Sequence, residues 1–220
     1  MNTLEIPSYQ AALQELNREL ANMLPADALE VFNTDAEALE ENQRFILKLR
    51  EGDKAPDFTL SNALNERVNL YEVLKTKRVV LSFYRGNWCP YCNLTLHHYQ
   101  SILPEIKKAG AVLIAISPQT PDASLSMKEK NELQFEVLSD NGNLIAKQYT
   151  SVHTNPEKYL KKMTELGYDY DSYYADEASE IPVPATFIIE KDTSVSFAKS
   201  AGGDYRNRVE ASEILNVLNK

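Results

Sequence analysis

Cys89 and Cys92 are the chain's two cysteines, and they lie three positions apart in the run Trp88-Cys89-Pro90-Tyr91-Cys92. An apolar run typical of a buried strand precedes them, and a helix is predicted from Pro90 onward. A thiolate at a helix N-terminus faces unpaired backbone N–H groups and the positive end of the helix dipole. Both lower a cysteine pKa from about 8.5 towards about 3.5–7.5. The position predicts a nucleophilic thiol.

The spacing of the two cysteines also predicts a disulfide. Pro90 suits the first helical position, where its missing N–H costs nothing. Cys89 is then the capping residue, and its sulfur is within reach of the N–H or S–H of Cys92. One helical turn brings both sulfurs within bonding distance. The pair therefore predicts a dithiol–disulfide switch, with the capping position favouring Cys89 as the more ionised thiol.

Two other interpretations of the cysteines remain. They could be buried neighbours that act as small hydrophobic residues. They could also bind zinc, but a structural site needs four ligands, and only His97, His98, His153 and carboxylates remain, without a second paired motif. The strand–turn–helix position favours the redox interpretation. His97 and His98 lie on the same predicted helix; we expect one packed and one solvated, and neither catalytic.

Composition narrows the class of protein. The 220 residues are 43% hydrophobic and 25% charged, which is ordinary for a folded chain. A net charge of −9, without a cluster of lysines and arginines, disfavours nucleic acid and anionic membranes as partners. Two cysteines are too few for a fold that is held together by several disulfide bridges. Neither a secretory leader nor an apolar run of membrane-spanning length is apparent, so we expect the cytoplasm.

Residues 1–50 predict an N-terminal helical extension. Apolar residues recur at three- and four-residue spacing up to the interruption at Pro25. They are Tyr9, Leu13, Leu16, Leu20 and Met23. A second helix is predicted from Asp35 to Leu49, with Phe45 among its apolar positions.

Residues 51–220 alternate short β-type runs with helical segments, which indicates an α/β layer architecture. The run from Val79 to Tyr84 is the strongest strand. The other predicted strands are 111–117, 135–138 and a hairpin of 184–189 with 194–199; the predicted helices are 90–108, 122–133, 144–149 and 207–218. Residues 151–180 show no clear period and predict an insertion covering one side of the domain. We interpret this insertion as a partly packed loop, with a tyrosine-rich contact surface as the alternative.

The segment Gly52-Asp53-Lys54-Ala55-Pro56-Asp57-Phe58-Thr59-Leu60, together with the strand and cysteine turn, resembles peroxiredoxins of the alkyl hydroperoxide reductase and thiol-specific antioxidant family. The resemblance runs from about Gly52 to Lys220. It implies an α/β thioredoxin-like fold, a central mixed sheet flanked by helices, and thiol redox chemistry. No non-protein cofactor and no metal is implied.

This sequence departs from the family pattern at the expected site. Counted from Phe83-Tyr84, the family's attacking cysteine falls on Cys92, and its threonine is replaced by Cys89. Pro184 stands where the family has a peroxide-orienting arginine. The Cys-Pro-Tyr-Cys motif with a proline before a strand instead resembles thioredoxins and glutaredoxins, where that proline is cis. We therefore predict a cis Val183–Pro184 bond.

Two enzymatic mechanisms follow from the resemblance. In the first, one cysteine reduces a hydroperoxide and the other resolves the sulfenic acid as a disulfide, which an external thiol such as thioredoxin or glutathione reduces. Family position favours Cys92 as the attacker and the capping position favours Cys89. Arg85 could supply the missing cation, or could be a surface residue at the strand end.

In the second mechanism, Cys89 attacks a disulfide of a protein or of glutathione, and Cys92 releases the product. Trp88 and Pro184 would then frame a substrate groove, with Tyr91 inside the motif as a supporting residue. A third interpretation is a redox sensor or binding module in which the disulfide switches a partner surface. The N-terminal helices could also form a homodimer. We favour peroxide reduction because of the family resemblance.

Overall fold

The computed structural model describes residues 6–43, 45–175 and 180–220. Strand β3 (Arg78–Phe83) is an inner strand of the main sheet, and every residue after Arg78 in it is buried. β3 runs parallel to β4 (Ala111–Ser117) and antiparallel to β8 (Ala185–Ile189). In the described part of the chain, the main sheet has the order β2-β1-β5-β4-β3-β8-β9. Its remaining strands are β1 (Thr59–Asn62), β2 (Arg67–Asn69), β5 (Glu136–Ser139) and β9 (Val195–Lys199).

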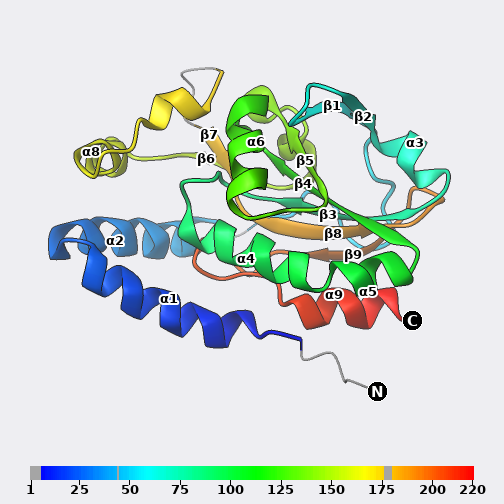
Figure 1. Ribbon diagram of the computed structural model, residues 1–220, viewed down its shortest axis with the longest axis horizontal. Helices are drawn as coiled ribbons and strands as arrows, with labels where there is room; N and C mark the ends of the chain where they lie inside the picture. Colours follow the sequence, from blue (N-terminus) through cyan, green and yellow to red (C-terminus); the bar gives the residue numbers. More distant parts are fainter. Residues whose placement is uncertain (1–5, 44, 176–179) are drawn as a thin grey trace.

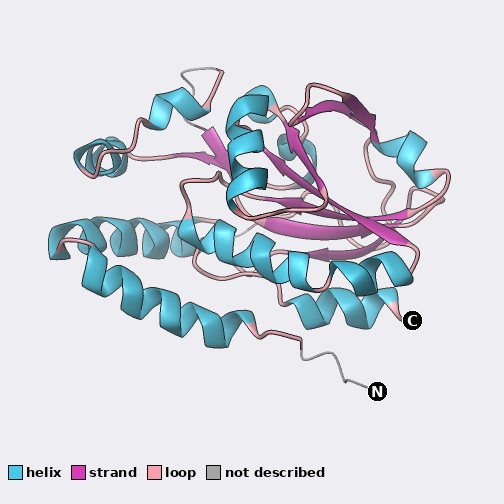
Figure 2. Ribbon diagram, viewed as in Figure 1, coloured by secondary structure: helices cyan, strands magenta, loops and turns pink. Residues whose placement is uncertain are grey.

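Helices cover both faces of this sheet (Figures 1 and 2). Side chains alternate along β3, so Val80 contributes to one core while Val79 and Leu81 contribute to the other. The first core is closed by α4 (Pro90–Ser101), α5 (Leu103–Lys108), α6 (Pro121–Lys130) and α9 (Ala211–Leu218). The second is closed by α3 (Leu70–Leu74) and α7 (Ala146–Tyr149). The predicted mixed sheet flanked by helices is thus confirmed.

The predicted helix over 90–108 is two helices. α4 ends at Ser101, and α5 starts at Leu103 after Ile102, whose backbone is not helical. Pro104 is the reason for the break, because its ring would clash with the carbonyl four residues earlier and its nitrogen has no hydrogen to donate.

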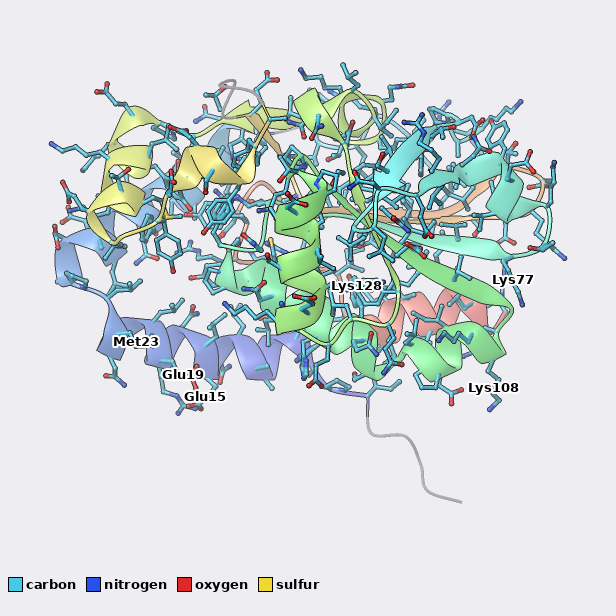
Figure 3. The ribbon with its side chains drawn as sticks, turned by 45° about the horizontal axis from the view of Figure 1, so that its top comes forward. Glu15, Glu19, Met23, Lys77, Lys108 and Lys128 are labelled. Carbon is cyan, nitrogen blue, oxygen red and sulfur yellow. The ribbon has the colours of Figure 1, made fainter. Side chains whose placement is uncertain are left out.

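The N-terminal extension contains α1 (Tyr9–Met23) and α2 (Ala26–Asn42). Pro25 separates them as predicted, but the second helix starts earlier than Asp35 and ends before Leu49. Pro25 directly precedes α2, and Ala28, Val31 and Ala36 supply the helix with its buried positions. Phe45 is 86% exposed, so its predicted packing is wrong. Residues 1–5 and 44 lie outside the described residues. Figure 3 shows Glu15, Glu19 and Met23 on α1 at the rim of the molecule.

The interpretation of 151–180 as a loop is wrong. This segment contains β6 (Val152–Thr154), α8 (Glu157–Glu165) and a 3₁₀ turn, η2 (Tyr170–Tyr173), and β6 pairs with β7 (Glu180–Pro182). Residues 176–179 lie outside the described residues. α8 packs on α2 through the rings of Phe32 and Tyr159, 4.9 Å apart, and through an ion pair of Lys162 with Asp27. The insertion therefore packs against the second N-terminal helix, and α8 and α2 lie near each other at the left of Figure 1.

The hairpin of β8 and β9 is confirmed, whereas the last helix begins later than predicted. Glu210 and Glu213 form a capping box that starts α9 at Ala211 rather than at Asn207. Arg208 consequently lies in a loop. Among the described helices, none is long and apolar enough to cross a membrane.

Candidate functional site

Cys89 and Cys92 occupy the first turn of α4, directly after the loop that follows β3. Cys89 caps the helix with an extended backbone, Pro90 is at the first helical position, and the Cys92 N–H donates to the Cys89 carbonyl at 3.0 Å. Both sulfurs are free thiols, and both residues are buried, with exposed fractions of 1% and 0%. The predicted strand–turn–helix arrangement of the pair is therefore present.

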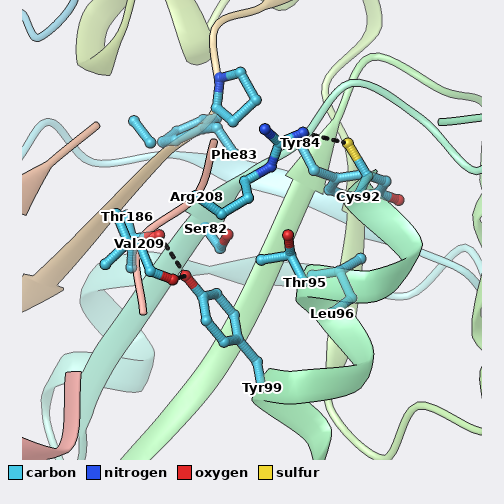
Figure 4. A pocket seen from close by; sticks show the side chains of 12 residues that line it. Ser82, Phe83, Tyr84, Cys92, Thr95, Leu96, Tyr99, Thr186, Arg208 and Val209 are labelled. Atoms are coloured by element: carbon cyan, nitrogen blue, oxygen red, sulfur yellow. Dashed lines mark hydrogen bonds between the residues drawn. The ribbon is translucent and has the colours of Figure 1, made fainter. Parts of the chain in front are cut away.

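A charged hydrogen-bond donor reaches Cys92. Arg208 donates from Nη2 to its sulfur at 3.3 Å (Figure 4). Burial opposes the thiolate, but the neighbouring Cys89 thiol and the guanidinium charges outweigh it, so the pKa of Cys92 lies well below its ordinary value. Burial and the neighbouring Cys92 sulfur raise the pKa of Cys89 well above its ordinary value.

The side-chain cap that favoured Cys89 as the more ionised thiol is not formed. Among the described residues, no backbone N–H of α4 caps the Cys89 side chain. A thiolate is stabilised by the donors that reach its sulfur, and the shorter guanidinium contact, that of Arg208 at 3.3 Å, is to Cys92, whereas Arg85 is 4.0 Å from Cys89.

Arg208 is a functional candidate that the sequence did not reveal. It is 7% exposed, and its other donors bind the backbone carbonyls of Tyr205 and Asn207. These bonds hold the guanidinium in the loop before α9, facing α4. An arginine beside a predicted helix start carries no signal for contact with a cysteine 116 residues away.

Arg85 is buried completely, so its interpretation as a surface residue is wrong. Its guanidinium lies 3.6 Å from the ring centre of Tyr205 and 4.9 Å from that of Trp88. Nη2 donates to Asn155 at 3.2 Å, and Nη1 is 4.0 Å from the Cys89 sulfur. A second fixed positive charge therefore lies beside the cysteine pair.

Trp88 and Tyr91 lie on either side of the Cys89 turn. Trp88 is 6% exposed, and its Nε1 donates to the Tyr174 hydroxyl at 2.7 Å. Tyr91 is half-buried, and its hydroxyl is 3.4 Å from Asn17 of α1. The insertion and the N-terminal helices thus both contact the cysteine turn.

The two histidines of α4 are placed as predicted. His98 is buried beside the ring of Tyr9, with ring centres 6.1 Å apart, and His97 is exposed.

Comparison with known proteins identifies the family. The profile of the AhpC/TSA family matches residues 51–198. The chain belongs to the AhpC/TSA family. Residues outside the matched segment include the whole of α1, α2 and α9, together with Arg208.

Curated relatives of this AhpC/TSA chain are peroxiredoxins. A candidate peroxiredoxin of the bcp type from Coxiella burnetii is 32% identical over 135 residues, which are 61% of this chain and 87% of that protein. Peroxiredoxin Bcp of Escherichia coli K12 is 33% identical over 46% of this chain and 64% of its own length. The chloroplastic peroxiredoxin Q of Suaeda salsa is 33% identical, and the match covers 47% of this chain and about half, 48%, of that protein.

Solved structures have the same fold. Peroxidoxin BcpB of Mycobacterium tuberculosis superposes with a TM-score of 0.60 at 21% identity, covering 78% of this chain and 97% of its own. A mutant PrxQ of Xylella fastidiosa also gives 0.60, at 16% identity, covering 78% and 96%. These likenesses confirm the predicted thioredoxin-like fold.

Within this AhpC/TSA chain, Pro184 does not adopt the predicted conformation. The structure contains no cis peptide bond among its described residues, so Val183–Pro184 is trans. The Val183 N–H donates to the Ser151 carbonyl at 2.8 Å, and its carbonyl accepts from the Thr150 hydroxyl at 2.9 Å. These bonds hold an extended trans chain between β7 and β8.

Pro184 nevertheless lies near the cysteines. It lines a small cavity together with Cys92, Thr95 and Arg208. The resemblance placed the family's arginine at position 184, and here a guanidinium reaches Cys92 from Arg208 instead. The site therefore contains a cation beside the Cys92 sulfur.

Proposed function

We propose that this AhpC/TSA-family chain is a thiol peroxidase that reduces hydroperoxides by a Cys89–Cys92 dithiol–disulfide cycle. The observation that carries the proposal is the contact of Arg208 with Cys92, whose pKa is held well below its ordinary value by the donors around it. A thiolate is the nucleophile that peroxide reduction requires. The relatives named above are peroxiredoxins, which supports the same chemistry.

In the proposed reaction, the Cys92 thiolate attacks the terminal oxygen of the hydroperoxide. The O–O bond breaks, the remaining alkoxide takes a proton and leaves as an alcohol or as water, and Cys92 becomes a sulfenic acid. The Cys89 sulfur then attacks the sulfenic sulfur, water leaves, and a disulfide forms. An external thiol, with thioredoxin and glutathione as the first candidates, returns both cysteines to thiols. The chemistry needs no prosthetic group.

The roles of the neighbouring residues follow from their contacts. Arg208 stabilises the Cys92 thiolate and polarises the incoming peroxide, while Arg85 places a positive charge beside Cys89. Trp88 and Pro90 belong to the turn that carries Cys89. Tyr91 lines the cavity at Cys89, and Pro184 lines the cavity at Cys92. Attack on the disulfide of a substrate protein is less favoured, because the relatives named above are peroxiredoxins.

Stopped-flow fluorescence of Trp88, the only tryptophan, tests the proposal. Reduced wild type, Cys89→Ser and Cys92→Ser are mixed with stoichiometric hydrogen peroxide or an organic hydroperoxide. Wild type should oxidise far faster than a free thiol and form a disulfide. Cys92→Ser should lose the fast phase, and Cys89→Ser should keep it but stop at the sulfenic acid. Oxidation of wild type no faster than free cysteine would refute the peroxidase function.

A further inference from the structure

The two sulfurs of the site face different cavities. Cys92 lines the small cavity with Arg208, which measures about 10 Å³, room for about one water-sized group. Cys89 instead lines a cavity of about 310 Å³. The larger cavity lies beneath α1 and α2, helices outside the part of the chain that the family profile matches.

The larger cavity is mainly apolar. Leucines and Met23 of α1 and α2 form one wall, and aromatic side chains of the cysteine turn, α8 and the loop before α9 form the other. Its apolar lining includes Leu16, Leu20, Leu29, Phe32, Trp88 and Tyr159. Its charged lining consists of Arg85 beside Cys89, with Glu19 and Lys130. A ligand with an apolar chain therefore suits this cavity better than a densely charged one.

The surroundings of the two sulfurs also determine which one an external thiol attacks. When a thiol opens a disulfide, the departing sulfur leaves as a thiolate, and the better-stabilised thiolate leaves faster. Arg208 Nη2 is 3.3 Å from the Cys92 sulfur, whereas Arg85 Nη1 is 4.0 Å from the Cys89 sulfur. Cys92 is therefore the better leaving group, and Cys89 is the sulfur that is attacked.

We propose that the disulfide is reduced at Cys89 by a small thiol carried on an apolar chain, which binds in the cavity beneath α1 and α2. This inference rests on the disulfide cycle of the proposed function. It adds the sulfur attacked, the route of entry and the chemical class of the reductant, and it gives the N-terminal helices a role in reductant selection.

The electrons balance with two equivalents of thiol. The first thiolate attacks the Cys89 sulfur, the Cys89–Cys92 bond breaks, and Cys92 leaves as the thiolate beside Arg208. A second thiolate attacks the sulfur of the bound carrier and releases Cys89 as a thiolate, which takes up a proton. Two thiols are oxidised to one disulfide, and the protein disulfide is reduced to two thiols.

A pair of thiols that differ only in chain length tests the inference. N-acetylcysteamine and N-hexanoylcysteamine share the same thiol and amide groups, so the four additional methylenes are the variable. The protein is first converted to its disulfide with diamide, which makes the measurement independent of peroxidase activity. We expect N-hexanoylcysteamine to reduce the disulfide on the order of tenfold faster, with saturation, because its chain is buried in the cavity. Equal rates for the two thiols would overturn the inference.

Two variants locate the effect. Leu16→Phe narrows the cavity and should remove most of the preference for the longer thiol, whereas Ala11→Phe on the exposed side of α1 should keep it. Peptide mapping after rapid alkylation should find the carrier attached to Cys89. Attachment to Cys92, or a Leu16→Phe effect confined to oxidation by organic hydroperoxides, would overturn the inference. Failure of the proposed function would appear separately, as slow oxidation of the reduced protein by peroxide.

Discussion

Two buried arginines determine the charge around two neighbouring sulfurs. Arg208 contacts Cys92 directly, and Arg85 lies beside Cys89 while packing against the ring of Tyr205. A guanidinium stays protonated at any pH at which the protein is folded, so both charges are permanent. The two cysteines therefore differ in acidity because of their contacts and not because of their residue type.

Replacing Arg208 with methionine should weaken the Cys92 nucleophile. Without the guanidinium, the pKa of Cys92 should rise, and each unit of rise corresponds to about tenfold less thiolate at a pH below that pKa. The thiolate disappears as the pH falls through this pKa, so activity should be lost at a higher pH than in wild type. Thiolate absorbance and the peroxide rate, each measured against pH, check this prediction.

Arg206→Met is the matched control, because Arg206 pairs with Asp204 at 2.8 Å rather than with a cysteine. It should leave both pH profiles near wild type. Identical profiles for Arg208→Met and wild type would exclude the proposed role of Arg208.

At the scale of elements, the loop between β3 and α4 fixes the cysteine turn against the insertion. Trp88 bonds to Tyr174, and the Tyr174 hydroxyl also donates to the Arg85 carbonyl at 3.3 Å. The Asn87 N–H donates to Gln119 at 2.8 Å, which ties the same loop to the segment after β4. The turn is consequently held from two sides of the molecule.

Gly86→Ala should displace Trp88. A Cβ at position 86 would lie 2.5 Å from Trp88 Nε1, closer than packed atoms approach. We expect a loss of about 1–3 kcal/mol in the free energy of unfolding and a shift of tryptophan emission. Urea denaturation followed by fluorescence measures both.

Tyr174→Phe provides the comparison, since it removes the hydrogen bond to Trp88 but leaves the ring in place. It should lower the free energy of unfolding by about 1 kcal/mol and should shift the tryptophan emission less than Gly86→Ala does. A Gly86→Ala variant as stable as wild type would mean that the indole tolerates a methyl group at this position.

At the scale of the whole molecule, the insertion and the N-terminal helices close over one end of the sheet and bury polar groups there. His153 of β6 is one of them, and neither ring nitrogen has a hydrogen-bond partner among the described residues. Burial, aided by the charge of Arg85, lowers the pKa of His153 to about 3. The folded protein therefore holds this imidazole neutral where an unfolded chain would protonate it.

The free energy of unfolding should consequently decrease as the pH falls below about 6.5. Between about pH 6.5 and 3 the unfolded chain binds the His153 proton and the folded protein does not, so each pH unit costs about 1.4 kcal/mol. Between pH 7 and pH 5, wild type should lose about 2 kcal/mol more than His153→Leu. Denaturant titrations at both pH values give this difference.

His97→Leu is the control, because His97 is exposed, and its free energy of unfolding should change with pH as that of wild type does. The same change with pH in His153→Leu and in wild type would contradict the prediction.

The expected homodimer through the N-terminal helices stays a prediction. Parts of both helices are used within the chain: Tyr9 of α1 donates to the Arg206 carbonyl at 2.6 Å, and the Phe32 carbonyl of α2 accepts from Tyr205 at 2.7 Å. Sedimentation equilibrium measures the assembly directly. A mass of 24.9 kDa rather than twice that value would exclude the dimer.

The sequence by itself determined the features that depend on local pattern. The apolar run at 79–84 can bury both faces of a strand, which suits the inner position that β3 has in the sheet. The Cys-Pro-Tyr-Cys spacing placed both thiols on one helical turn, because proline and the 3.6-residue period act within a few residues. The hairpin of β8 and β9 was predicted for the same reason.

Only the tertiary structure decided which of the two thiols has the lower pKa and which charged groups lie beside the cysteines. The pKa of Cys92 depends on Arg208, 116 residues away, and the burial of Arg85 depends on rings from α8 and from the loop before α9. The insertion was interpreted as a loop because its apolar side chains show no period along the chain. They are buried by contacts with α2 and with Trp88, which are distant in the sequence. Long-range packing brings these groups together, and a periodicity read along the chain does not contain that information.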